Sequence, residues 1–350
     1  MKRILVGAMF AGLLALGWNW SSEAAEMVSG QGPYKFRVLY TSSILPAKAQ
    51  EVLEKAHGGF AVDRRAGKGE TFFALPGAGI LRIGADLKTV ELLDTDASMR
   101  DTNLHNSTLW FDRAGKGFLV FPGNQSNRVY TTTMDGKLLD TIEPPTDKVK
   151  FAEPKVATYF REGGPFVPTD VEYLDGTYYI ATGYSKLDYV LMARVMGTSP
   201  FRTSWTRKAF GGKGEGVGQF GTGHGITVPP GKKRIDVADR PNAEIDRFTP
   251  AGKYIDTVKT PPGSFPCDID YEGRFGVIGS LNHPDKTKGA PVYLLEGDKI
   301  VSTILPKEEL GLEKFMHIHN ATMRTIDGKI YLIVQAWNPG DFAILEQVTN

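Results

Sequence analysis

A chain of 350 residues is long enough for one large domain or for two of ordinary size. With 41% hydrophobic and 23% charged residues, it has the composition of a globular protein with enough apolar side chains for a core. Its 41 basic and 40 acidic residues give a formal net charge of +1, without a basic stripe or an acidic tail. This balance argues against nucleic acid or an anionic membrane surface as a partner.

The first 25 residues have the features of a signal peptide. Lys2 and Arg3 precede a short apolar stretch, Ile4 to Leu16, and Ser22-Glu23-Ala24 supplies small residues at the two positions that a signal peptidase reads. No later stretch is apolar over the roughly eighteen residues that a membrane span needs. We therefore expect residues 26–350 to be the mature protein, periplasmic or secreted and without a membrane span. An uncleaved anchor is the alternative.

After this segment, the sequence predicts a strand at Tyr34–Thr41 and a helix at Ala47–His57. Six related segments then follow one another to the end of the chain. A second helix is expected at Lys307–Phe315, just before the sixth segment. The segments begin at Gly59, His105, Thr169, Gly223, Cys267 and His319.

The fourth segment, Gly223–Val258, shows the repeating unit clearly, because GITV, RIDVAD, EIDRFTP and KYIDTV are separated by turns. Apolar side chains alternate in each piece, which is the pattern of a pleated strand. Six such units of about 35 to 55 residues predict an all-β fold, a six-bladed β-propeller, formed by residues 26–350 as a single domain. The sixth unit ends after three strands. We therefore expect Tyr34–Thr41 to supply its fourth strand and to close the ring.

Three of the six histidines fall at one position of the repeat. Innermost strands line the central channel of a propeller, and alternate blades lie about 120° apart, so histidines at this position in every second blade should converge on the axis. The other three histidines, His57, His283 and His317, do not fall at the repeat position. His57 lies one residue before it. The residue just before each innermost strand is, in blade order, Gly58 (or His57), His105, Thr169, His224, Cys267 and His319.

Three converging imidazoles can hold a metal ion and leave one tetrahedral position open, which is the arrangement of a catalytic zinc site. Such an ion activates water or polarises a substrate oxygen. The expected ligands are His105, His224 and His319. Zinc is the expected metal, with copper or another divalent ion as alternatives. The competing interpretation is that these are ordinary channel residues, each hydrogen-bonded to the backbone.

Gly211–Val228, GGKGEGVGQFGTGHGITV, together with the following VADRPNAEIDRF, resembles the NHL-repeat family of propellers. Within that family the chain is most similar to the peptidyl-α-hydroxyglycine α-amidating lyases, most strongly from Phe166 to Ile245. The resemblance implies a zinc ion held by three histidines from three blades. It also implies that Tyr184, in TGYS, is the general base and that Arg240, in ADRPN, binds a carboxylate or stabilises the phenolate. A packed tyrosine and a structural turn arginine are the alternatives.

Two positions depart from the lyase pattern. Asn320 follows the last of the three histidines where the lyases have an aspartate, and its amide cannot take up a proton. Near Leu75, the lyases carry an arginine that this chain lacks, while Arg64 and Arg65 fall in a turn. Cys267 is the only cysteine, so no intramolecular disulfide can form. It is either a ligand for a softer metal such as copper or an inert buried thiol.

Together, these observations predict a periplasmic zinc-dependent lyase that binds a small-molecule or peptide substrate in the central channel. The substrate class implied by the resemblance is a carbinolamide, such as a peptidyl-α-hydroxyglycine. One alternative is a non-enzymatic periplasmic propeller that binds a protein partner or carries a metal. Another is a hydrolase that uses a metal-activated water.

Overall fold

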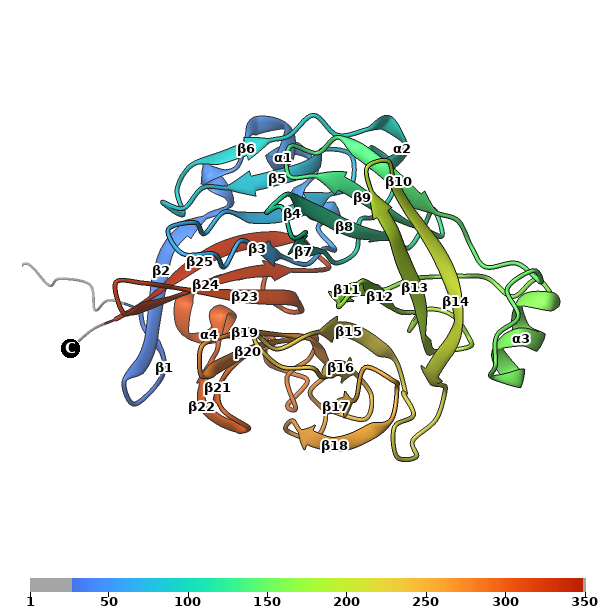
Figure 1. The fold of residues 1–350 in the computed structure, drawn as a ribbon. Helices are drawn as coiled ribbons and strands as arrows, with labels where there is room; N and C mark the ends of the chain where they lie inside the picture. Colours follow the sequence, from blue (N-terminus) through green and yellow to red (C-terminus); the bar gives the residue numbers. More distant parts are fainter. Residues whose placement is uncertain (1–26, 349–350) are drawn as a thin grey trace, which may run out of the picture.

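The computed structural model describes residues 27–348, so the predicted signal peptide lies outside the described residues. Within residues 27–348, the strands form six antiparallel sheets arranged around a common axis (Figure 1). This is the all-β six-bladed propeller that the repeats predict. The four strands of the fourth predicted unit are found in the expected places. No helix in the described range has the length and the apolar character needed to cross a bilayer.

In the first three blades, the strands run in chain order from the axis to the rim. Blade one consists of β3 (Ala61–Val62), β4 (Thr71–Leu75), β5 (Gly79–Ile83) and β6 (Val90–Leu92). Blade two consists of β7 (Thr108–Phe111), β8 (Gly117–Gly123), β9 (Arg128–Thr133) and β10 (Leu138–Ile142). Blade three consists of β11 (Asp170–Leu174), β12 (Thr177–Ala181), β13 (Tyr189–Thr198) and β14 (Phe201–Gly211).

Blades four and five follow the same order, and blade six joins the two ends of the chain. Blade four consists of β15 (Gly223–Thr227), β16 (Ile235–Asp239), β17 (Glu244–Phe248) and β18 (Tyr254–Lys259). Blade five consists of β19 (Pro266–Glu272), β20 (Phe275–Ser280), β21 (Val292–Glu296) and β22 (Lys299–Ile304). Blade six consists of β23 (Ile318–Ile326), β24 (Lys329–Ala336), β25 (Asp341–Gln347), β2 (Tyr34–Thr41) and β1 (Ser29–Gln31).

The N-terminal strands close the ring as predicted. β2 pairs antiparallel with β25, with Phe36 opposite Gln347, and β1 pairs with β2. Phe36 is fully buried against the side chains of blades five and six. Because β2 covers the outer edge of β25, the last strand of the chain does not end the sheet with unpaired backbone groups.

The helices are short and lie in the connections. The expected helix at Ala47–His57 is α1 (Ala47–Glu51) followed by the 3-10 turn η2 (Leu53–Lys55), with η1 (Ser42–Ile44) before them. The expected helix at Lys307–Phe315 is α4 (Pro306–Leu310), which ends where Gly311 takes a left-handed φ of 68°. Two helices were not predicted, α2 (Ala97–Arg100) and α3 (Pro154–Arg161).

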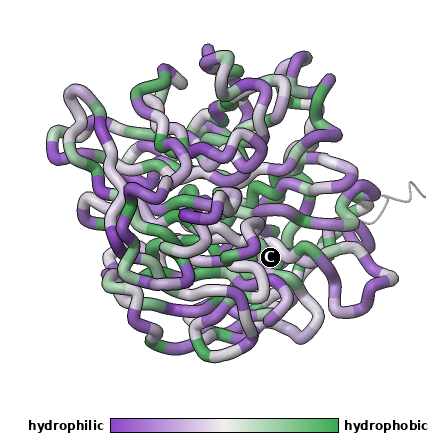
Figure 2. Tube along the Cα trace, turned by 90° about the vertical axis from the view of Figure 1, so that its right-hand side faces the viewer, coloured by the Kyte–Doolittle hydropathy of each residue, from purple (hydrophilic) through white to green (hydrophobic). Residues whose placement is uncertain are grey.

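The hydrophobic core lies between the blades. Figure 2 shows hydrophobic segments gathered inside the molecule and hydrophilic loops at its periphery. Six clusters of buried side chains occur in the described residues, and each one joins two adjacent blades. Full burial of a large apolar side chain stabilises a fold by roughly 1.5–3 kcal/mol. Adjacent blades are therefore fixed to each other, and with them the residues that face the axis.

Carboxylates of the innermost strands tie neighbouring blades together along the channel. Asp170 accepts a hydrogen bond from the backbone N–H of Ile226 in the next blade, at 2.8 Å. Two blades further on, Glu272 accepts one from the N–H of Thr325, at 2.7 Å. Asp270 is also paired with Arg64 at this end of the channel. The acidic lining of the channel thus has a structural role between the strands.

Candidate metal centre

The repeat position identified in the sequence is a β-bulge in blades four, five and six. In β15, β19 and β23 the pairing register shifts at His224, Cys267 and His319 respectively, so each of these residues is left without a direct partner on the adjacent strand. A bulge of this kind redirects a side chain from the face of the sheet. In blade two, His105 lies just before β7, and its backbone N–H donates to the carbonyl of Pro122 at 2.8 Å.

Each of the three histidines is held by the next blade. The Nδ1 atom of His105 lies 2.6 Å from the carbonyl oxygen of Thr169, that of His224 lies 2.7 Å from the oxygen of Cys267, and that of His319 lies 2.8 Å from the oxygen of Gly58. A carbonyl oxygen can only accept, so Nδ1 carries the proton in all three rings. The Nε2 lone pair of each ring is therefore free to bind a metal ion. The three acceptors are the repeat-position residues of the intervening blades.

The three Nε2 atoms converge on the axis. Nε2 of His105 lies 3.2 Å from that of His224 and 3.0 Å from that of His319. Three nitrogens bound tetrahedrally to one zinc ion at ordinary bond lengths are separated by about 3.4 Å. These two separations come within a few tenths of an ångström of that value, and the rings of His224 and His319 have centroids 5.0 Å apart, so the residues fit a metal ion held by three imidazoles.

Burial keeps these imidazoles neutral, which metal binding requires. His105, His224 and His319 are each 0% exposed. Loss of hydration lowers the pKa of all three well below the usual value for histidine, and the nearby charge of Arg240 lowers them further. A protonated ring would repel both its neighbours and a cation, whereas neutral rings offer three lone pairs at one point.

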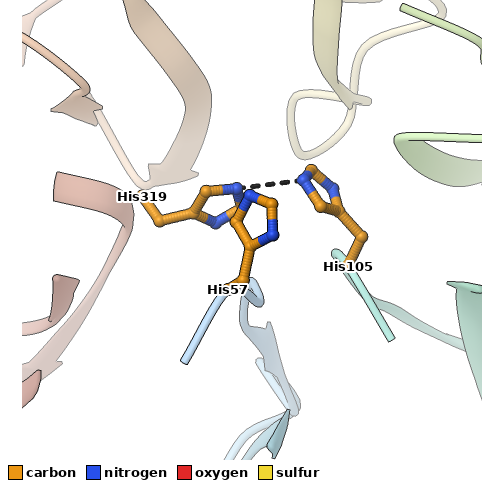
Figure 3. Close-up of side chains that lie close together, drawn as sticks. All are labelled: His57, His105 and His319. Atoms are coloured by element: carbon orange, nitrogen blue, oxygen red, sulfur yellow. Dashed lines mark hydrogen bonds between the residues drawn. The ribbon is translucent and has the colours of Figure 1, made fainter. Parts of the chain in front are cut away.

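His57 joins this centre, although the sequence placed it one residue off the repeat position. Donor nitrogens of His57, His105 and His319 all lie within 4.8 Å of one another and could hold a metal ion (Figure 3). The Nδ1 atom of His57 lies 3.0 Å from the side-chain nitrogen of Asn103, which donates to it, and its Nε2 lies 3.5 Å from Tyr184 Oη. Burial, followed by the charge of Arg240, lowers the pKa of His57 to about 3. The sequence signal for His57 was its near coincidence with the repeat position.

Tyr184 lies beside the histidines, where the resemblance placed it. It follows β12, and its Oη is 3.2 Å from Nε2 of His105 and 3.0 Å from Nε2 of His224. The residue is nonetheless 36% exposed, so Tyr184 lies between the buried imidazoles and the solvent. Loss of hydration raises the pKa of Tyr184, and the charge and hydrogen bond of Arg240 oppose that rise.

Arg240 connects Tyr184 to the thiol of blade five. It follows β16, is 7% exposed, and donates from Nη1 to Tyr184 Oη at 3.0 Å and from Nη2 to Cys267 Sγ at 3.1 Å. Asp239 accepts from the backbone N–H groups of Gly221 and Thr222, both at 2.9 Å, and so supports the turn rather than the centre. Burial raises the pKa of Cys267, which favours the thiol over the thiolate.

The departures from the lyase pattern are visible in the structure. Asn320 follows His319 in β23, and its amide donates to Asn106 and to Asp268 at 3.3 and 3.2 Å. Leu75 is 1% exposed in the core between blades six and one, and Arg64 is paired with acidic side chains of blade five instead of facing the centre. His283 and His317, which had no register in the sequence, lie outside the group of converging donors.

A cavity of about 520 Å³ opens beside the centre, on the side of His57. Exposed charged side chains form part of its rim, and an aromatic ring and amide side chains line the rest. A second cavity of about 420 Å³ lies along the innermost strands and includes the channel carboxylates Asp170 and Asp268. The first cavity is lined by Glu54, Lys55, His57, Pro76, Gly77, Asp101, Asn103, Gln125, Trp337 and Asn338.

No protein family model matches the sequence, and no curated protein matches it. Among solved structures, the chain is similar to selenomethionine-substituted virginiamycin B lyase from Staphylococcus aureus, with 13% identity and a TM-score of 0.50 over 90% of this chain and 100% of that one. A streptogramin B lyase structure is 12% identical, with a TM-score of 0.49 over 85% of this chain and 95% of that one. At 13% identity the likeness to the virginiamycin B lyase structure supports the propeller fold alone.

Proposed function

We propose that this protein is an exported zinc-dependent lyase that cleaves the carbon–nitrogen bond of a carbinolamide such as a peptidyl-α-hydroxyglycine. The observation that carries the proposal is the convergence of three Nε2 lone pairs from alternate blades, each ring fixed by a carbonyl of the next blade. Tyr184 and Arg240 lie at the same point, which adds a proton acceptor and a cation to the three imidazoles.

His105, His224 and His319 would hold the zinc ion, which supplies Lewis-acid polarisation of a substrate oxygen when it is bound. Tyr184 Oη would take the proton of the substrate hydroxyl as phenolate, once the metal ion or Arg240 has lowered the pKa that burial raises. The carbon–oxygen bond then becomes a carbonyl as the carbon–nitrogen bond breaks, and the nitrogen regains a proton. The products are a primary amide and glyoxylate. Arg240 stabilises the phenolate and offers its remaining N–H groups to the substrate carboxylate.

The second candidate is a non-enzymatic propeller that carries a metal ion or binds a protein partner. Two observations favour it. Asn320 cannot exchange a proton, and the second strand of blade one, β4, which ends at Leu75, carries no arginine. A hydrolase built on the same centre is the third candidate, and it differs from the lyase in the products it releases.

The test is glyoxylate release from a short α-hydroxyglycine peptide by zinc-loaded protein. We expect stoichiometric amide and glyoxylate from the wild type, and neither from His224→Ala. His283→Ala is the matched control, because it removes a histidine outside the centre. Metal binding without turnover would favour the metal carrier, and cleavage of a different bond in the peptide would favour the hydrolase. Absence of metal from the wild-type protein would refute both enzyme proposals.

A further inference from the structure

The cavity beside His57 borders the metal centre through one shared side chain. His57 lies in its wall and is also one of the converging donors, so a molecule held there lies against an imidazole of the centre. The cavity along the innermost strands and the groove along α3 have no histidine in their walls. The geometry therefore selects the cavity beside His57 as the approach for a substrate.

Trp337 gives this cavity a flat apolar wall. The ring lies just after β24, stacked on His57 with centroids 5.2 Å apart and planes 27° apart, and its backbone N–H donates to His317 at 2.9 Å. Its indole N–H has no acceptor among the described residues, and the side chain is partly exposed. The Trp337 ring is thus held in place by His57, while its exposed part and its indole N–H remain available for a ligand.

Asn103, on the same wall, carries an acceptor that the protein does not use. Its side chain is 2% exposed, its nitrogen contacts Nδ1 of His57, and its Oδ1 has no hydrogen-bond donor among the described residues. A buried carbonyl oxygen without a donor is unfavourable, so it requires an N–H or O–H group from a ligand or an ordered water, and a peptide N–H can supply it. Gln125 is fixed against the backbone N–H of Asn103 at 3.2 Å and keeps its own amide N–H groups available.

These features fit a peptide. A flat wall binds a planar or bulky apolar side chain, and an unused acceptor next to an unused donor matches the backbone N–H and C=O of an extended chain. The charges at the rim, on Glu54, Lys55 and Asp101, have mixed sign and select no strongly charged ligand. A small hydroxy acid without an apolar side chain would leave the Trp337 ring unused.

We propose that the cavity between His57, Asn103 and Trp337 binds the residue that precedes the reacting group of a peptide substrate, with an aromatic side chain against Trp337 and a backbone N–H on Asn103 Oδ1. This inference rests on the proposed peptide substrate of the lyase. Trp337 is then the specificity-determining residue, and Asn103 positions both the peptide and His57. Neither residue takes part in bond cleavage.

The test is equilibrium binding of two product-like amides, N-acetylphenylalaninamide and N-acetylalaninamide, to zinc-loaded protein by calorimetry. We expect the aromatic amide to bind about tenfold more tightly to the wild type. Trp337→Ala should abolish this preference, Trp337→Phe should restore most of it, and metal content should be the same in all three proteins. Trp205→Ala, which removes an indole of the outer strand β14, is the matched control.

The two proposals fail in different ways. Equal affinity for the two amides, or a preference that survives in Trp337→Ala, overturns the assignment of the cavity even if glyoxylate is released. A preference that depends on Trp337 without any glyoxylate release supports the cavity and refutes the lyase. If Trp337→Ala lost its metal as well, the comparison would rest on Trp337→Phe, and an absence of aromatic preference in that metal-loaded variant would overturn the assignment.

Discussion

Replacing His224 by alanine removes one of three converging imidazoles and should weaken zinc binding strongly. Zinc sites with four protein ligands have apparent binding free energies of about 10–16 kcal/mol, so a single ligand contributes on the order of 3 kcal/mol. That loss corresponds to a roughly 200-fold weaker affinity. His57 can retain some affinity in the variant if its ring turns away from the Asn103 amide that now donates to its Nδ1, because its donors lie within 4.8 Å of those of His105 and His319.

Thermal unfolding with and without zinc measures this difference. Free zinc at about a thousand times its dissociation constant stabilises the wild type by about 4 kcal/mol, which raises the Tm of a chain of this length by roughly 6 °C. In His224→Ala the same zinc concentration is only about five times the dissociation constant. The expected stabilisation there is about 1 kcal/mol, with a Tm rise of roughly 2 °C. Chelator should reverse both shifts.

His283→Ala should keep the full wild-type shift, because its ring lies outside the centre. An equal zinc-induced rise in wild type and His224→Ala would refute the ligand assignment. So would a wild-type protein that binds no divalent metal by elemental analysis. A shift in His224→Ala close to that of the wild type, but lost in the double variant with His57→Ala, would instead transfer the ligand role to His57.

Further predictions concern the base, the channel and the closure of the ring. Tyr184→Phe should retain its zinc and lower kcat for an α-hydroxyglycine peptide by about 10²–10⁴-fold, and an unchanged kcat would remove Tyr184 from the chemistry. Burial raises the pKa of Glu172 to about 7, so its charged form is disfavoured in the fold, and stability should fall as pH rises from about 4.5 through 7. Glu172→Gln should remove about 2 kcal/mol of this fall in denaturant unfolding across that range, and parallel pH profiles would contradict the assignment. Deletion of residues 27–41 removes β1 and β2 and exposes the edge of β25, so we expect loss of soluble monomer in size-exclusion chromatography. A folded monomer after that deletion would show that closure is dispensable.

The repeats made the fold predictable from the sequence. Strand alternation in Gly223–Val258 and its five relatives gave the blades, and the missing fourth strand of the last unit indicated that Tyr34–Thr41 closes the ring. The short helix α3 was not predicted, because Pro154–Arg161 lies in a long connection between blades where no repeat pattern applies. Its amphipathic side packs Val156 and Phe160 into the core between blades two and three, which is a tertiary effect.

The convergence of His105, His224 and His319 was predictable because equivalent positions of a propeller face the same axis. The position of His57 was not, since a residue one place before the repeat position has no fixed direction in the repeat. Its ring is directed by contacts distant in sequence, the amide of Asn103 and the face of Trp337. The contact of Arg240 with Cys267 was not predictable either. It joins blades four and five through two side chains that no local sequence pattern relates.

At the repeat position, histidine occurs in every second blade of the propeller. This alternation follows from the way each imidazole is oriented. A ring at the repeat position needs a carbonyl oxygen from the following blade, and Thr169, Cys267 and Gly58 supply it. The three rings approach to centroid distances of 4.5–5.0 Å, and the ring of His57 from blade one packs against two of them, 4.4 Å from His319 and 4.7 Å from His105. At Gly58 even a Cβ would lie 3.0 Å from the carbonyl oxygen of Ala74. A fourth histidine in blade one therefore had to enter from the preceding residue, where it faces the cavity as well as the centre.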